Sequence, residues 1–281
     1  MRFSVDDFTW SKAHLGKVLA TLSKHDDGIS LDQLSVTSPS FSITAQGEWR
    51  GKDAGLGRLQ GSLTSTDVEA TLAQLGSPDV ISAKTGRVDV DLNWVGAPSA
   101  EALSEAVGHV QISMEKGQLL GVKPGAGRVL GLASLTALPR RLALDFSDLT
   151  DKGLAFDSAR GDFDLRGGNA YTDNVLIKGP AAEIGMIGRI GLKARDYDQT
   201  AVVTGNVGNS LPIAGIAGAF AAGPVVGGVV LLFTQVFKQP LKGLARAYYH
   251  IGGTWENPSI ERVSSGANAA TAGAPKEAGS K

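Results

Sequence analysis

Cysteine is absent from the 281 residues, which excludes disulfides and thiol catalysis. An excess of either charge is absent too, because 27 Lys and Arg stand against 28 Asp and Glu, for a net charge of −1. A balanced chain has no field that gathers phosphate backbones, so nucleic acid is not an expected partner. Aromatic residues are few, at 6%, whereas glycine supplies 37 residues. This composition favours many short strands joined by tight turns.

Charged side chains are missing from the whole of Gln199–Phe237. The stretch is long enough for a membrane span, which needs about 20 apolar residues. However, Pro212 and Pro224 interrupt it, and proline breaks the helical hydrogen-bond pattern. We therefore expect an apolar helical hairpin buried in protein or in lipid, with a kinked span over 211–237 as the alternative. The candidate membrane-contact or groove-closing residues are Ile213, Ile216, Phe220, Val225, Val229, Leu232, Phe233, Val236 and Phe237.

Strand-like alternation fills most of the remaining chain. In Phe41–Trp49 and Gly86–Trp94 apolar residues alternate with polar ones, which is typical of strands with one buried face. Such segments recur at roughly ten-residue intervals with turn signals between them, which indicates an antiparallel meander. The predicted fold class is mainly β: a curved, elongated antiparallel sheet, shaped as a groove, with a few short helices and the C-terminal apolar hairpin.

The expected organisation has three parts. Residues 1–198 form the sheet groove, with short helices at about 67–75, 99–107 and 125–137. Residues 199–263 hold the helical hairpin and closing strands, and 264–281 form a disordered tail of small residues. The opening residues are strand-like and carry no signal peptide, so we expect either a cytosolic protein or a fragment whose export signal lies upstream.

Motifs for catalysis are weak. The glycine-rich segments at 125–131 and 55–61 share one spacing without a βαβ context, so neither predicts a dinucleotide site. The four histidines are scattered at spacings that suit no metal. Pairs such as Asp89 and Asp91 fall on the polar side of a strand pattern. We expect no catalytic residue, no cofactor, no metal and no enzymatic activity, and the rival interpretation is an enzyme acting on lipid or glycan through Asp196 and Asp198.

The apolar faces of the strands exceed what the few helices can cover. A second sheet, a closed barrel or a bound ligand could fill them. A C16 acyl chain gains on the order of 10 kcal/mol on burial, so an open apolar face suffices to hold it. The candidate groove residues are Phe41, Ile43, Leu63, Val88, Val90, Leu92, Ile112, Leu144, Phe163, Ile177 and Ile187.

Several long segments resemble the C-terminal region of YhdP-type proteins of the AsmA-like family. They are PGAGRVLGLASLTALPRRLALDFSDLTDKGLAFDSARGDFDLRGGNAYTDN, KARDYDQTAVVTGNV, SLPIAGIAGAFAAGPVVGGVVLL and YYHIGGTWENPSIE. GEWRG, LGSPDVI and LNWVGAP fit the same region. The resemblance extends from the first strands to Val263, and the motifs are long enough to be specific.

The resemblance implies a bridge-like lipid carrier related to TamB. Such proteins are anchored in the inner membrane of Gram-negative bacteria and extend across the periplasm. This chain would be the outer-membrane-proximal end, without the anchor, and would conduct phospholipid without enzymatic chemistry. Its partners would be phospholipid acyl chains and the outer membrane, with envelope proteins as further candidates. The alternative is a periplasmic structural or chaperone-like adaptor that uses sheet edges for outer-membrane assembly.

Overall fold

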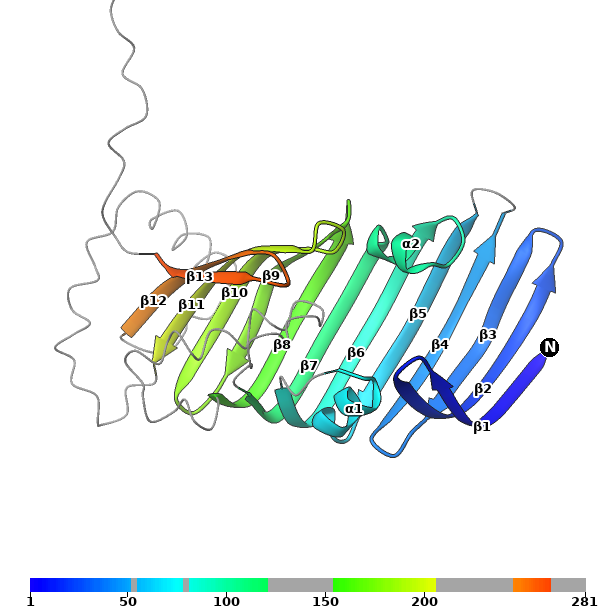
Figure 1. The fold of residues 1–281 in the computed structure, drawn as a ribbon, viewed down its shortest axis with the longest axis horizontal. Coiled ribbons are helices and arrows are strands. Elements are labelled where there is room, and N and C mark those ends of the chain that lie inside the picture. Colours follow the sequence, from blue (N-terminus) through cyan, green and yellow to red (C-terminus); the bar gives the residue numbers. More distant parts are fainter. Residues whose placement is uncertain (52–54, 78–80, 121–153, 206–244, 264–281) are drawn as a thin grey trace, which may run out of the picture.

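The computed structural model describes residues 1–51, 55–77, 81–120, 154–205 and 245–263. Within them, a single sheet of 13 strands follows the chain in order, and each strand is antiparallel to its neighbours (Figure 1). The strands are β1 Arg2–Trp10, β2 Ala13–His25, β3 Gly28–Thr37, β4 Phe41–Arg50, β5 Leu56–Ser65, β6 Ile81–Val95, β7 Val107–Leu119, β8 Leu154–Arg166, β9 Asn169–Lys178, β10 Ala182–Gly191, β11 Asp196–Gly205, β12 Ala245–Gly253 and β13 Pro258–Arg262.

Within the described residues the sheet is open, because β1 and β13 form its two edges and each pairs with one neighbour only. Figure 1 shows the strands side by side along the long axis of the molecule. The prediction of a mainly β chain with a curved antiparallel sheet and few helices is confirmed. The predicted helix at 125–137, the apolar hairpin with its nine candidate residues, Leu144 and the tail at 264–281 lie outside the described residues.

Two short helices lie at opposite ends of the strands (Figure 1). Helix α1, Val68–Gln74, follows β5 and is capped by Asp67, whose side chain accepts a hydrogen bond from the Ala70 amide. Helix α2, Ala100–Ser104, follows β6 and is capped by Ser99. We call the two ends of the strands the α1 end and the α2 end. Among the described residues, neither helix is long enough or apolar enough to cross a bilayer.

Helix α1 packs closely because β6 offers a glycine beneath it. A Cβ atom at Gly86 would lie 2.8 Å from Cγ2 of Val68, so glycine leaves the space that the helix occupies. Thr71 fixes the helix further, since its hydroxyl lies 2.8 Å from Ser65 Oγ and donates to the Ser40 carbonyl. The helix therefore covers the sheet at β4–β6.

Two hydrophobic clusters lie on the sheet. The larger contains residues of β6–β13, such as Ile184 and Ile251, together with Val68 of α1. The smaller contains Val18, Val36 and Phe41 of β2–β4. Leu72 of α1 packs against the larger cluster and Leu75, at the end of the helix, against the smaller. Helix α1 thus joins the two parts of the core.

Glycine at position 57 is predicted to be essential for packing at the α2 end. Its Cβ atom would lie 2.1 Å from Cε2 of Trp94, so Gly57→Ala must displace the indole ring. We expect a loss of about 1–3 kcal/mol in the free energy of unfolding, measured by urea titration. Thr64→Ala, on the exposed face of the same strand, should change it by less than about 0.5 kcal/mol. Equal effects of the two substitutions would contradict this packing.

Candidate functional site: the apolar face of the sheet

Residue pairing sorts the side chains of the sheet into two faces. Because directly paired residues point to the same side of a sheet, the register defines rows that cross the strands. One row is entirely aliphatic over seven strands. It consists of Val5, Val18, Val36, Ile43, Leu63, Val88 and Ile112.

The next two rows on this face have the same character. One contains Phe3, Ala20, Leu34, Ala45, Gly61, Val90, Val110 and Phe163, and the other contains Leu22, Leu31, Gly47, Leu59, Leu92, Gly108 and Leu165. These three rows carry no charged side chain from β1 to β8. They bring together the predicted residues Ile43, Leu63, Val88, Val90, Leu92, Ile112 and Phe163, and we call this surface the apolar trough.

Where it crosses β4–β7, the trough is only half-buried. Ile43, Leu63, Val88, Val90 and Ile112 all retain partial exposure. Toward β9–β13 the same face is closed, since Ile184 and Ile251 are fully buried. Open hydrocarbon is therefore presented mainly by β3–β8, which cover about 24 Å at a strand spacing of about 4.8 Å.

Two of the predicted groove residues belong to the packed core. Phe41 is 4% exposed and lies in the smaller cluster near the end of α1. Ile177 is 2% exposed and lies in the larger cluster. Both face the same side as the trough, but protein covers them, so neither offers surface to a ligand.

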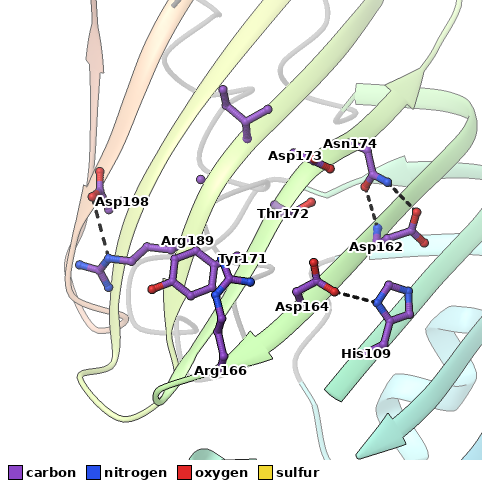
Figure 2. A pocket seen from close by; sticks show the side chains of 12 residues that line it. His109, Asp162, Asp164, Arg166, Tyr171, Thr172, Asp173, Asn174, Arg189 and Asp198 are labelled. Carbon is purple, nitrogen blue, oxygen red and sulfur yellow. Dashed lines mark hydrogen bonds and ion pairs between the residues drawn. The ribbon is translucent and has the colours of Figure 1, made fainter. Parts of the chain in front are cut away.

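A third predicted residue, Ile187, lies on the opposite face. It pairs with Thr200, whereas Met186 and Gly188 pair with the buried Ala201 and Gln199. Ile187 lines a shallow polar hollow with His109, Asp162, Asp164, Arg166, Tyr171 and other polar residues (Figure 2). The prediction that Ile187 shares a face with the trough is therefore corrected.

The walls of the trough are formed at the two ends of the strands. Helix α1 covers the row of Ser65 and Gly86 at one end. At the α2 end, eight residues further along the strands, lie Trp49 and Trp94, which share a row with Gly57. Eight strand residues correspond to about 26 Å. A leaflet holds about 15 Å of hydrocarbon, half of a 30 Å core, so an acyl chain can lie along the strands between these walls.

The tryptophan wall depends on glycines of the neighbouring strand. Trp94 is 9% exposed, and its ring lies over Gly57. Trp49 lies against Gly55, and its Nε1 donates to the Gly96 carbonyl at 2.9 Å. Sequence reasoning placed both tryptophans on the apolar side without a site role. The signal was the glycine-rich segment that pairs with them, because aromatic rings commonly cover glycines of an adjacent strand.

The opposite face of the sheet is a ladder of polar and charged groups. Asp91 accepts hydrogen bonds from Gln60 and Arg58, which lower the pKa of its carboxyl. The hydrogen bond between Arg87 and Asp89 lowers the pKa of Asp89 in the same way. The aspartate pairs thus take part in surface pairing. Among the described residues, no three potential ligands gather closely enough to hold a metal ion.

The polar hollow is likewise paired internally. His109 Nδ1 lies 3.1 Å from Asp164, and Asn174 Nδ2 donates to Asp162 at 2.6 Å (Figure 2). Arg189 donates two hydrogen bonds to Asp196, which lower the pKa of that carboxyl, and lies 3.9 Å from Asp198 (Figure 2). Asp196 and Asp198 are therefore both partners of one arginine. These are the two residues that the rival interpretation made catalytic.

Comparison with known proteins decides the family. The sequence model of the YhdP protein family matches residues 1–260 of this chain. The chain belongs to the YhdP family. The family resemblance predicted from its sequence segments is therefore confirmed.

A curated relative supports the same assignment. It is the Escherichia coli (strain K12) protein named "Intermembrane phospholipid transporter YhdP", which is 31% identical over 252 residues. The aligned region covers 88% of this chain and 20% of the relative, so the chain spans about one fifth of that protein's length. No solved structure matches the chain.

Tyr197 provides a pH-dependent test of the buried face. Its hydroxyl has no hydrogen-bond partner in the described structure, and burial, with a smaller effect of Glu256, raises the pKa of the phenol to about 12. In the unfolded chain the phenol has its ordinary pKa of about 10. Because the pKa is higher in the folded protein, the free energy of unfolding is largest below pH 10 and falls as the pH rises from 10 to 12. Tyr197→Phe should therefore flatten the fall of the unfolding free energy over this range.

At pH 7 the same variant should be as stable as the wild type or more so, because an unpaired buried hydroxyl is removed. Denaturant unfolding at several pH values measures both effects. The control Tyr171→Phe removes a half-buried phenol on the polar face, so comparing the two variants separates the effect of position 197 from the general effect of removing a phenol. An unchanged slope in Tyr197→Phe would show that this phenol does not govern the alkaline transition.

Proposed function

We propose that this chain is a section of a phospholipid-conducting bridge, in which the apolar trough holds acyl chains. The observation that carries the proposal is the set of uncharged apolar rows from β2 to β8, whose large side chains on β4–β7 remain half-exposed. Large exposed apolar surfaces of this kind mark binding sites for apolar partners. The name of the Escherichia coli relative indicates a phospholipid as that partner.

The backbone arrangement suits hydrocarbon. On β4–β7 every trough residue lies within the antiparallel ladder, where its N–H and C=O groups are paired with neighbouring strands. An acyl chain therefore meets side chains without uncovering unpaired backbone, which would be costly. Transport along such a surface is non-enzymatic, because chains slide between equivalent rows and no bond is made or broken.

The place in the cell follows from the same proposal. A bridge between two membranes would cross the periplasm, with this section at the outer-membrane-proximal end. The partners would be phospholipid acyl chains and the outer membrane. The sheet groove of 1–198, the closing region of 199–263 and the tail remain the proposed organisation.

A structural adaptor that adds a strand to β1 is less well supported. The edge strand β1 is interrupted by register shifts between Val5 and Phe8 and between Phe8 and Thr9. It also carries Asp6 and Asp7 within the shifted segment. Bulges and charges are the usual means by which edge strands avoid pairing with other chains.

Photocrosslinking tests the proposal at two neighbouring positions. A photoreactive amino acid at Ile112, in the trough, should capture phospholipid in cells that carry the full-length protein. The matched control at Gln111, the adjacent residue on the polar face, should capture none or much less. Equal capture at both positions, or capture at neither, would overturn the trough as the lipid path.

A charge in the trough should block transport without unfolding the sheet. Val90→Glu places a carboxylate on a half-exposed apolar row, where a passing acyl chain would have to desolvate it. We expect transport in cells to fall strongly, measured by the arrival of labelled phospholipid in the outer membrane. The control Thr44→Glu puts the same charge on the polar face and should transport as the wild type does. Normal transport by a folded Val90→Glu variant would be evidence against conduction over β6.

A further inference from the structure

The two walls of the trough differ in polarity. Helix α1 begins with the acidic residues Asp67 and Glu69 and has no basic residue in its last turn. Its apolar residues Val68, Leu72 and Leu75 pack against the hydrophobic clusters of the sheet. This wall therefore offers hydrocarbon contacts inside and negative charge at the helix start, which would repel a phosphate group.

The α2 end of the same face has an interfacial composition. One row crosses it in the order Lys24, Ile29, Trp49, Gly57 and Trp94, and we call this row the tryptophan rim. Ile29 is 49% exposed and Lys24 is exposed beside it at the β2 end of the row. Indole rings and lysine side chains favour the boundary between hydrocarbon and water, because each has an apolar body and a polar end.

Two arginines near this rim are paired with carboxylates, and Asp26 in the turn between β2 and β3 is exposed. Arg50 contacts Glu48 at 2.8 Å and Asp27 at 4.0 Å. Arg58 contacts Asp91 on the polar side. Lys24, by contrast, belongs to the row that continues the trough, so it places an ammonium at this margin.

From this asymmetry we propose that a bound phospholipid lies along the strands with its head group over the tryptophan rim and its acyl ends toward α1. The inference rests on the proposed function and adds an orientation to it. A charged head group must stay in water, because burying an unpaired charge costs far more free energy than the burial of each CH₂ group of an acyl chain gains. Among the described residues, the α2 end brings solvent, the Lys24 ammonium and two amphipathic rings together next to the trough.

The orientation can be tested on the unmodified full-length protein. Two phospholipids are compared, one with a photoreactive diazirine in the head group and one with the diazirine at the acyl end. After irradiation, peptide mass spectrometry locates the crosslinks. The head-group probe should label the rim around Ile29 and Trp49, and the acyl-end probe should label the α1 wall around Leu72 and Met114.

The outcomes separate the orientation from the function. If the acyl-end probe labels the rim, or if both probes label both walls equally, the orientation is wrong while lipid binding stands. If neither probe labels the trough, the proposed function itself fails. The variant Lys24→Glu provides a second measurement, in which head-group crosslinks at Ile29 should fall and acyl-end crosslinks at Met114 should persist. Unchanged head-group crosslinks in this variant would show that Lys24 does not help to hold the head group at the rim.

Discussion

The pairing of antiparallel strands is the constraint on which the structure depends. Each strand of the sheet satisfies the backbone of its neighbour, and successive residues alternate between two faces. Because the register runs without a shift from β4 to β7, one choice of side chains per strand produces a continuous apolar surface and, behind it, a continuous polar ladder. A slip of one residue would exchange the two faces, so the uncharged trough is a direct consequence of register.

The remaining features adjust this surface. Glycines within the apolar rows admit close neighbours, as Gly86 does for Val68 and Gly57 for Trp94. Helix α1 joins the two hydrophobic clusters and closes one end of the strands. The sheet is therefore stabilised by clusters at its sides, while the middle of β3–β8 stays half-exposed. An apolar surface that the fold does not need to fill is what a carrier of hydrocarbon requires.

Local alternation made the strands and most trough residues predictable from the sequence. Val88, Val90 and Leu92 follow a strict period of two between aspartates, so their common face could be derived without coordinates. Ile187 was assigned to the wrong face because its strand is rich in small and apolar residues on both sides. Arg189, two positions on, carried the correct signal, since residues two apart share a face.

Features that depend on contacts between distant residues could not be predicted. The sequence gives no indication that α1 and the adjacent core would bury Phe41, or that Ile177 would lie in the larger cluster. The tryptophan rim depends on the register that brings Trp49, Gly57 and Trp94 into one row. Such a row becomes visible only when several strands are paired.

The absence of native cysteine allows the central claim to be measured with a single spin label. Nitroxides are attached at Val90→Cys in the trough and, separately, at Asp91→Cys on the polar face, and their accessibility to oxygen and to a water-soluble nickel complex is measured by electron paramagnetic resonance. On addition of phospholipid vesicles, the label at position 90 should gain oxygen contact and lose contact with the nickel complex, while the label at 91 stays in water. If position 90 is inaccessible to both reagents from the start, or does not respond to lipid, the trough is filled by protein and the account is contradicted.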